Sequence, residues 1–319
     1  MNDAVDSTFV WRRALLRSGR LGKRIGLTTT GGRAGAAAAR LIDRPSRPIG
    51  RAAALFDQFV TCTNTGPRVP DPLACVEGFL RTLPVAVDGM AFMHSSTPGR
   101  CVVAVSVAGA PRYVLKIGSL EDLPLRNEAE FLGTVSGAGF PFRIPSLVSA
   151  DITGDRFVMV THAWVTSHQA GLLSRRELLN ITQALAEAGN GGPVVHGDLA
   201  PWNVLRTPAG LGIVDWERAT LTGRPMTDLI HYLVQAGSHL RWFDTKQVVQ
   251  ELTHPHGTLA QLAHRLGYSS SLVEQALQTY FTSLPAAGAR RVRQFRDSVA
   301  SAVGVSGYDP PGVPLPQGP

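Results

Sequence analysis

The chain has 319 residues, of which 44% are apolar and 17% charged, with a formal net charge of +7. This composition is typical of a soluble globular protein, and the length allows one large domain or two modest ones. No run approaches the ~18 apolar residues of a membrane-spanning helix, and the first residues lack the layout of a secretory signal. The cysteines Cys62, Cys75 and Cys101 have no metal-ligand spacing. We therefore expect reduced thiols and a cytoplasmic location.

The positive charge is concentrated near the N-terminus. Residues 1–75 contain twelve Lys and Arg against five Asp and Glu, whereas residues 76–319 contain nineteen of each kind. We expect a basic N-terminal extension and linker over residues 1–75. Within it, residues 1–53 could contact nucleic acid or an anionic membrane. The favoured interpretation is a solvated surface extension, because only two aromatic residues, Phe9 and Trp11, lie among the arginines.

The first regular elements are two predicted antiparallel strands, CVVAVSVA (101–108) and RYVLKIG (112–118), joined by a turn at 109–111. Alternation places Leu115 and Lys116 on opposite faces of the second strand. A lysine among apolar neighbours late in a strand costs free energy unless it meets an anion. The strand therefore predicts an anion partner for this lysine.

A helix is predicted next over LRNEAEFLGTV (125–135), which offers two candidate acidic side chains, Glu128 and Glu130, on different faces. RFVMVTHAW (156–164) then predicts a buried strand. The interval that follows holds one convincing helix, SRRELLNITQALAEAG (174–189).

The C-terminal part is predicted to be helical as far as about residue 303. Ser271 and Glu274 have the spacing of a capping box before an amphipathic helix that contains Tyr280. Residues 306–319 are proline-rich and predict a disordered tail.

The stretch from 192 to 217, GPVVHGDLAPWNVLRTPAGLGIVDWE, holds the most specific pattern. It predicts a hairpin-like unit, with a first apolar strand at Val194 and Val195, Asp198 in a turn, Asn203 five residues later, and Asp215 at the end of a second apolar strand. Carboxylate and amide oxygens suit Mg²⁺, which leaves its other positions to phosphate and water. Asp198 is then free to orient or deprotonate a hydroxyl. One such aspartate alone would be an ordinary turn residue.

The motifs HGDLAPWN and IVDWE resemble the aminoglycoside phosphotransferase and choline kinase-like family of small-molecule kinases. The resemblance implies an α+β, bilobal protein-kinase-like fold. Its N-lobe would be a small antiparallel sheet with a helix over residues 76–162, and its C-lobe would be mainly helical over residues 163–305. The implied activity is ATP-dependent transfer of a phosphoryl group to a hydroxyl of a small molecule.

The resemblance also implies roles for individual residues. The implied set is Asp198 as catalytic base, Asn203 and Asp215 as ligands of Mg²⁺, Lys116 and Glu128 at the phosphates of ATP, and Val160 and His162 at the adenine. His196 and Asp228 would brace the catalytic loop by hydrogen bonds. The 94–100 loop departs from the kinase pattern, because it holds one glycine and no G-x-G-x-x-G motif.

Two questions stay open at this level. Residues 163–305 carry ten acidic and twelve basic side chains, which disfavours a polycationic antibiotic such as an aminoglycoside but leaves sugars, amino alcohols, metabolites or a lipid-linked glycan as acceptors. The alternative function is a catalytically weak, nucleotide-binding regulator. That alternative predicts the loss of a catalytic or metal-binding residue, and the sequence retains all of them.

Overall fold

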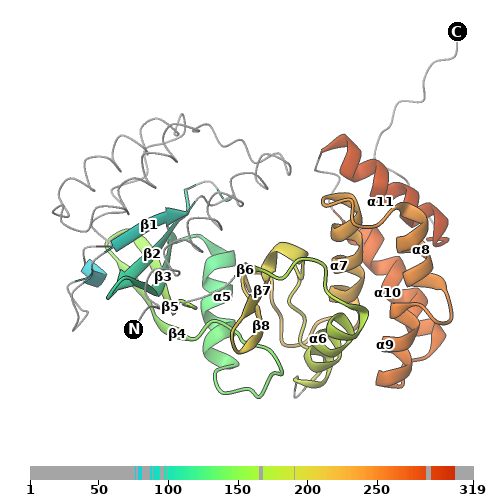
Figure 1. The fold of residues 1–319 in the computed structure, drawn as a ribbon, viewed down its shortest axis with the longest axis horizontal. Coiled ribbons are helices and arrows are strands. Elements are labelled where there is room, and N and C mark those ends of the chain that lie inside the picture. The colour runs from blue at the N-terminus through green and yellow to red at the C-terminus, as the bar shows by residue number, and fades with distance from the viewer. Residues whose placement is uncertain are drawn as a thin grey trace, which may run out of the picture. The chain divides into compact units, whose positions relative to one another are not determined.

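The computed structural model describes residues 76, 78–80, 87, 89–93, 97, 99–164, 168–189, 191–284 and 289–305. The expected N-terminal extension, the expected C-terminal tail and most of the 94–100 loop lie outside the described residues. The chain divides into two compact units (Figure 1). The first comprises the described residues up to Ser136 together with 144–168 and 206–210, and the second comprises 137–143, 169–205 and the residues from 211 onward.

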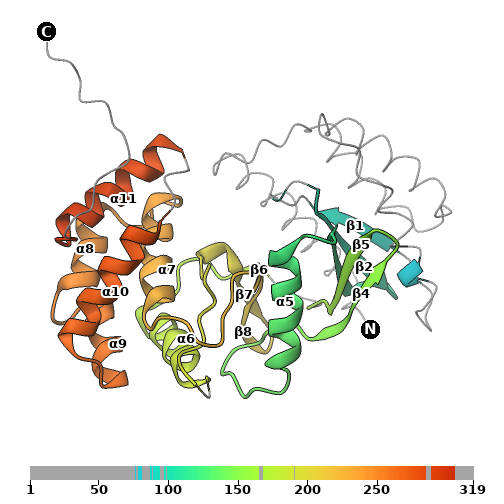
Figure 2. The same cartoon turned by 180° about the vertical axis from the view of Figure 1, so that it is seen from behind.

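The first unit is built on a five-stranded antiparallel sheet with strand order β1-β2-β3-β5-β4. Its strands are β1 (Gly89–Met93), β2 (Cys101–Val107), β3 (Ala110–Ser119), β4 (Leu147–Thr153) and β5 (Arg156–His162). Helix α5 (Leu123–Thr134) packs against β4 and β5, and Figure 2 shows this helix beside the sheet from behind.

The turn between β2 and β3 is shorter than the predicted turn at 109–111. Strand β3 already begins at Ala110, and the two turn residues Ala108 and Gly109 both have positive φ angles, 53° and 73°. Two consecutive residues with positive φ match the right-handed twist of the flanking strands in a two-residue hairpin. The two predicted strands are confirmed, but the predicted turn at 109–111 is wrong, because Pro111 lies inside β3.

Strand β3 has one face in the core and one face toward α5. Leu115 and Ile117 are almost fully buried in a core that also contains Val103 and Val160. Lys116 lies between Leu115 and Ile117 in the sequence, and its side chain contacts Glu128 of α5. The predicted alternation is therefore confirmed.

A small second sheet has the order β6-β7-β8, formed by β6 (His168–Gln169), β7 (Val204–Thr207) and β8 (Gly210–Ile213). The sequence predicted a hairpin whose first strand contains Val195. Val195 instead forms an isolated bridge with Thr220, and the hairpin is made by β7 and β8. A 3-10 helix, η1 (Pro201–Asn203), leads into β7.

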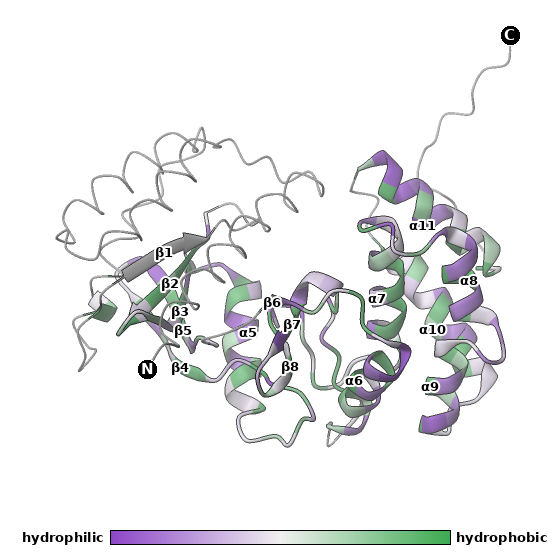
Figure 3. Ribbon diagram, in the orientation of Figure 1, coloured by the Kyte–Doolittle hydropathy of each residue, from purple (hydrophilic) through white to green (hydrophobic). Residues whose placement is uncertain are grey.

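The second unit is mainly helical. Its helices are α6 (Arg175–Glu187), α7 (Thr227–Ser238), α8 (Thr245–Thr253), α9 (Thr258–Leu266), α10 (Ser270–Ser283) and α11 (Arg290–Ala302). Helix α7 contacts α6, α8, α10 and α11. Ten of its twelve residues are buried, and Figure 3 shows hydrophobic colouring along most of this helix. The unit is therefore organised around α7.

Side-chain caps fix where these helices begin. Ser174 and Glu177 form a capping box at α6, and Asp244 and Gln247 form another at α8. The predicted box at Ser271 is wrong, because the N-cap of α10 is Ser269, whose hydroxyl accepts from the backbone N–H of Leu272. Three consecutive serines offer three cap positions, and the first of them is the N-cap.

The predicted α+β architecture, with a small antiparallel sheet in one lobe and a mainly helical second lobe, is confirmed. Of the helices in the described part of the chain, none combines the length and apolarity needed to span a membrane.

Candidate active site

The loop at residues 196–198 is held by the carboxylate of Asp228, the second residue of α7. Asp228 accepts from the backbone N–H of His196 at 2.7 Å and from that of Gly197 at 2.9 Å. Burial raises the pKa of this carboxyl, while His196 and the two backbone donors act in the opposite direction. The predicted bracing role of Asp228 is confirmed by these two bonds.

The His196 imidazole is fully buried, and both of its nitrogen atoms make hydrogen bonds. Its Nε2 lies 3.1 Å from the carbonyl oxygen of Val214, and its Nδ1 lies 3.2 Å from the backbone N of Asp198. A carbonyl can only accept and a backbone N–H can only donate, so Nε2 carries the proton and Nδ1 accepts. Burial lowers the pKa of His196 and favours this neutral form. His196 therefore braces the loop.

Gly197 is required for the shape of this loop. Its φ angle is +77°, and a Cβ added there would lie 2.4 Å from the carbonyl oxygen of Arg218. The positive φ disfavours other residues, and the close backbone oxygen excludes a side chain. The glycine thus allows the loop to pass close to the chain that follows Asp215.

Asp198 projects from the braced loop with its side chain 24% exposed. Its Oδ1 lies 2.9 Å from Nε2 of His231 on α7. Its Oδ2 lies 3.5 Å from Nδ2 of Asn203, which also donates to the backbone oxygen of Asp198 at 2.9 Å. One carboxylate oxygen is therefore held by a strong contact, and the other is held more loosely.

Asn203 and Asp215 are brought together by the backbone. The N–H of Val214 donates to the carbonyl oxygen of Asn203 at 3.0 Å, which places Asp215 one residue from this contact. Asp215 has a φ angle of 71°, a left-handed conformation that Asp and Asn tolerate better than most residues. Because Nδ2 of Asn203 is directed at Asp198, its Oδ1 is directed away from that residue.

The donor set fits Mg²⁺ bound together with a nucleotide. Among the described residues, no group of three His, Cys, Asp or Glu side chains is arranged to hold a metal ion. Mg²⁺ is commonly bound by one or two carboxylates plus phosphates and water. The carboxylate of Asp215 and the amide oxygen of Asn203 would supply two protein ligands, which leaves the other positions to phosphate and water.

In the first unit, Lys116 and Glu128 form a bidentate ion pair. Nζ of Lys116 lies 2.9 Å and 2.6 Å from the two carboxylate oxygens of Glu128. Glu128 is 1% exposed, whereas Glu130 is exposed. The predicted pairing of Lys116 with Glu128 is present, and their role at the phosphates of ATP stays a prediction.

A second buried ion pair in this unit was not predicted. Arg100 makes two bonds to Asp122, at 2.9 Å and 2.7 Å, and Asp122 also caps α5 by accepting from the backbone N of Leu125. Burial alone would raise the pKa of Asp122, but the hydrogen bonds from Arg100 and Leu125 outweigh it and hold the pKa below its usual value. The sequence signal was an aspartate just before Leu123–Pro124, a typical helix start.

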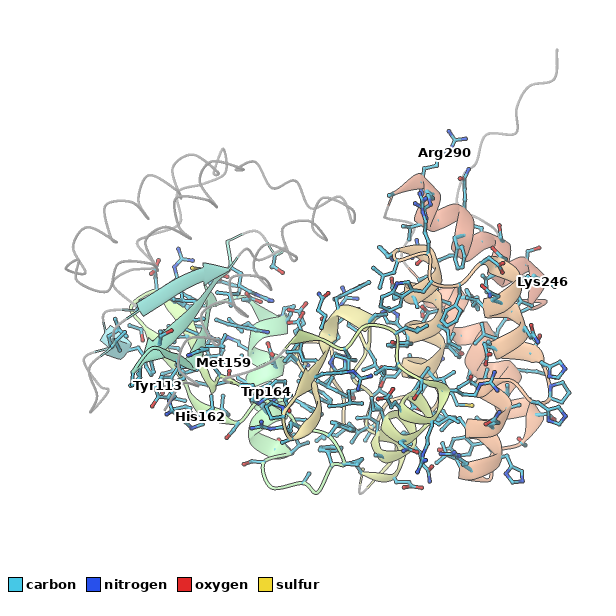
Figure 4. The ribbon with its side chains drawn as sticks, viewed as in Figure 1. Tyr113, Met159, His162, Trp164, Lys246 and Arg290 are labelled. Carbon is cyan, nitrogen blue, oxygen red and sulfur yellow. The ribbon has the colours of Figure 1, made fainter. Side chains whose placement is uncertain are left out.

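The predicted adenine-binding residues lie at the end of β5. Val160 is buried and pairs with both Leu115 and Ser149, whereas His162 is exposed and packs its ring against Tyr113 (Figure 4). The backbone N–H of His162 donates to Ser146, so an adenine contact at His162 has to use another group. Their role stays a prediction.

The comparison with known protein families gives one match, and most of the matched residues lie in the second unit. Residues 163–266 match the profile of a family described as the phosphotransferase enzyme family. The resemblance predicted from the HGD and IVDWE motifs is confirmed. The enzyme class, a kinase-type phosphotransferase, is confirmed with it. The match covers about a third of the chain, and no curated protein matches the sequence.

Solved structures of small-molecule kinases are also similar to this chain. One is a putative fructosamine-3-kinase from Haemophilus somnus, with 8% identity, a TM-score of 0.46, and coverage of 72% of this chain and 96% of that one. Another is the aminoglycoside phosphotransferase APH(2'')-Ib bound to ADP, with 11% identity, a TM-score of 0.45, and coverage of 72% and 98%. A third is APH(3'')-Id from Streptomyces rimosus, with 14% identity, a TM-score of 0.43, and coverage of 73% and 98%.

His231 was not predicted as a site residue, although it contacts Asp198 from 33 residues away in the sequence. In the sequence it stands in the apolar run LIHYLV, where it has the appearance of a core histidine. A signal was nevertheless present. His231 follows Asp228 by three residues, so the two share one face of α7. A residue on the face that braces the catalytic loop is a candidate neighbour of the catalytic carboxylate.

Proposed function

We propose that the protein is an ATP-dependent phosphotransferase that moves the γ-phosphoryl group to a hydroxyl of a small molecule. The observation that supports this most strongly is the braced loop. It presents Asp198 on a backbone held by Asp228 and His196, beside an amide and a carboxylate at Asn203 and Asp215. Phosphoryl transfer depends mainly on positioning and charge neutralisation, and this set offers both.

In the proposed mechanism Asp198 orients the acceptor hydroxyl and takes its proton as the hydroxyl oxygen forms a bond to the γ-phosphorus. The bond from that phosphorus to the bridging oxygen breaks, which leaves ADP. Asn203 and Asp215 would hold Mg²⁺, which when bound neutralises charge on the phosphates. Lys116, oriented by Glu128, would contact the phosphates.

The surroundings of Asp198 favour a neutral or anionic acceptor. Burial lowers the pKa of His239, and the guanidinium groups of Arg296 and Arg291 act in the same direction, whereas Asp198 opposes them. His239 also packs against Trp202, one residue before Asn203, with ring centroids 5.4 Å apart. Arg291 and Arg296 act on the pKa of His239, and cations there would repel a polycationic acceptor. We therefore rank sugars and anionic metabolites above polycationic aminoglycosides.

The test is a nucleotide-consumption screen with Mg²⁺ and ATP over hydroxylated metabolites, using the isosteric variants Asp198→Asn and Asp215→Asn. Asparagine keeps the shape of both side chains and tolerates the positive φ of residue 215. We expect Asp215→Asn to lose Mg²⁺-dependent nucleotide binding. Asp198→Asn should bind nucleotide normally while turnover falls by about 10²–10⁴-fold, the usual contribution of a general base.

The two variants also separate the proposed function from its alternative. The wild type could bind nucleotide and still turn over no faster than Asp198→Asn with every acceptor. That result would support the nucleotide-binding regulator. Equal loss of nucleotide binding in both variants would contradict the separate roles given to these residues. If the wild type neither binds nor consumes nucleotide, the kinase assignment is wrong.

A further inference from the structure

Three side chains form a hydrogen-bonded chain that runs from α10 to the candidate base. The hydroxyl of Tyr280 lies 3.1 Å from Nδ1 of His231, and Nε2 of the same imidazole lies 2.9 Å from Oδ1 of Asp198. Tyr280 is 4% exposed and His231 7% exposed. Burying polar groups to this extent costs folding free energy unless they are hydrogen-bonded. Each of these groups is hydrogen-bonded to its neighbour in the series.

The chemistry of the three groups fixes the direction of the bond to Asp198 and, for a neutral imidazole, that of the bond to Tyr280. The carboxylate of Asp198 can only accept, so Nε2 of His231 carries a proton and donates it. In the neutral imidazole Nδ1 is then an acceptor, and the hydroxyl of Tyr280 donates to it. Burial raises the pKa of Tyr280, so the phenol keeps its proton.

We propose that His231 is a positioning residue for the reaction and that Tyr280 holds its ring in the orientation and tautomer that this role needs. The bond from Nε2 occupies Oδ1 of Asp198 and fixes the rotation of the carboxylate. Oδ2, whose contact with Asn203 is 3.5 Å, is the oxygen left to receive the acceptor proton. The inference rests on the proposed function of Asp198.

The two helices are well placed for this role. Helix α7 carries Asp228, which holds the loop backbone, and His231, which holds the loop side chain. Helix α10 packs against α7 and supplies Tyr280, whose ring lies edge-to-face on the imidazole with centroids 5.9 Å apart. His231 is thus fixed both by a hydrogen bond and by ring packing.

The functional test compares His231→Gln with His231→Asn, two amides that differ in reach. The longer glutamine can place its N–H₂ group near the position of Nε2 and keep the bond to Asp198, whereas asparagine reaches only the position of Nδ1. We measure Mg·ATP turnover with water as acceptor, together with ATP binding and urea unfolding. We expect kcat to fall about 10–100-fold in His231→Asn and less than about 5-fold in His231→Gln, with the KM for ATP unchanged in both.

Tyr280→Phe removes only the hydroxyl and should lower kcat by about 3–10-fold at unchanged KM for ATP. The matched control is Tyr232→Phe. Tyr232 is also buried, lies next to His231 in α7, and its hydroxyl accepts from the backbone N of Leu173. This control should lower the stability and leave kcat unchanged.

A second readout does not depend on turnover. Nitrogen chemical shifts of labelled histidine should assign His231 to the Nε2–H tautomer in the wild type. Asp198→Ala and Tyr280→Phe should each shift it toward a mixture of tautomers, while Tyr232→Phe should not. A wild-type His231 in the Nδ1–H form would overturn the proposed hydrogen-bond direction.

The outcomes separate this inference from the proposed function. If Asp198→Asn is inactive while folded His231→Asn and Tyr280→Phe turn over like the wild type, the positioning role is wrong and the kinase mechanism stands. Equal loss in His231→Gln and His231→Asn, in proportion to lost stability, would also overturn the positioning role. If Asp198→Asn turns over normally, both are wrong.

Discussion

Glu128 and Glu130 stand two residues apart on α5 but have different surroundings. Glu128 is almost fully buried and bonded to Lys116 through both oxygens, whereas Glu130 is exposed. An exposed charge is solvated by water, while a buried one depends on its partner. This pair offers a residue-level test of the predicted phosphate-binding lysine.

We predict that Glu128→Gln weakens nucleotide binding by at least about 10-fold and lowers the unfolding free energy by about 1–3 kcal/mol, because Lys116 loses a charged, hydrogen-bonded partner. Glu130→Gln should change the stability by no more than about 0.5 kcal/mol. Nucleotide titrations and urea unfolding of both variants provide the measurement. Equal nucleotide affinity in the two variants would show that the ion pair does not orient the lysine.

At the residue level, the sequence predicted those site residues that lie close together in the chain or in a recognisable motif. Asp198, Asn203 and Asp215 fall within 18 residues, and Lys116 stands out as a charge in an apolar strand. His231 and Tyr280 could not be found in this way. Their contacts span 33 and 49 residues, and both occur in apolar helical patterns that predict ordinary core positions.

At the scale of elements, Glu251 links three helices of the second unit. It extends from α8 and accepts hydrogen bonds from Arg175 at the start of α6 and from the backbone N and hydroxyl of Thr258 at the start of α9. Burial alone would raise the pKa of Glu251, but the bonds from Thr258 and Arg175 outweigh it and the pKa lies below its usual value. The ionised carboxylate therefore stabilises the folded state.

This lowered pKa predicts a pH-dependent contribution to stability. Because the folded state holds the proton less tightly than the unfolded state, the contribution is fully present above the ordinary glutamate pKa of 4.5 and is lost as the pH falls below it. We predict that Glu251→Gln lowers the unfolding free energy by about 1–2 kcal/mol at pH 7. The difference from the wild type should shrink by pH 3.5.

The control for that measurement is Glu187→Gln, which changes an exposed glutamate at the end of α6. Urea unfolding at pH 7 and at pH 3.5 should give this variant nearly the wild-type stability at both values. If the stability difference between Glu251→Gln and the wild type is the same at both pH values, the carboxylate charge does not contribute to stability.

Element boundaries were less predictable than the elements themselves. Ser174 and Glu177 have the sequence signature of the capping box that they form. The same rule failed at α10, where Ser269 competes with Ser270 and Ser271 for the cap. A local pattern cannot decide among equivalent serines, because the packing of Ala276, Leu277 and Tyr280 sets the helix register.

At the scale of the whole molecule, the positive charge is concentrated in one segment of the chain. Residues 1–53 contain eleven Lys and Arg against three Asp and Glu, a larger surplus than the net charge of +7 of the entire chain. The remaining chain is close to neutral. Retention on a cation exchanger depends on net charge, so deleting this segment should weaken it.

We predict that a protein lacking residues 1–53 elutes from a cation exchanger at much lower salt and retains wild-type nucleotide turnover. Polyanion binding measured over a range of salt concentrations decides between the two interpretations of the segment. Salt-sensitive binding that the deletion abolishes would support a polyanion-binding extension, and weak binding that the deletion leaves unchanged would support a solvated extension. Loss of turnover on deletion would contradict both.

The overall architecture could be predicted because it depends on features that repeat along the chain. Alternation over 101–118 and helical periodicity beyond 174 gave the sheet and the helices. The central place of α7 could not be predicted, because an apolar helix does not reveal how many neighbours will cover it.

That central place has a consequence for how relatives of this enzyme can diverge. Asp228 and His231 both belong to α7, and both contact the 196–198 loop. Any insertion, deletion or rotation in α7 therefore displaces both together. Changes in α8, α9 and α11 that leave α7 in place do not carry that penalty. We expect new acceptor preferences to accumulate in those three helices while α7 keeps its length and register.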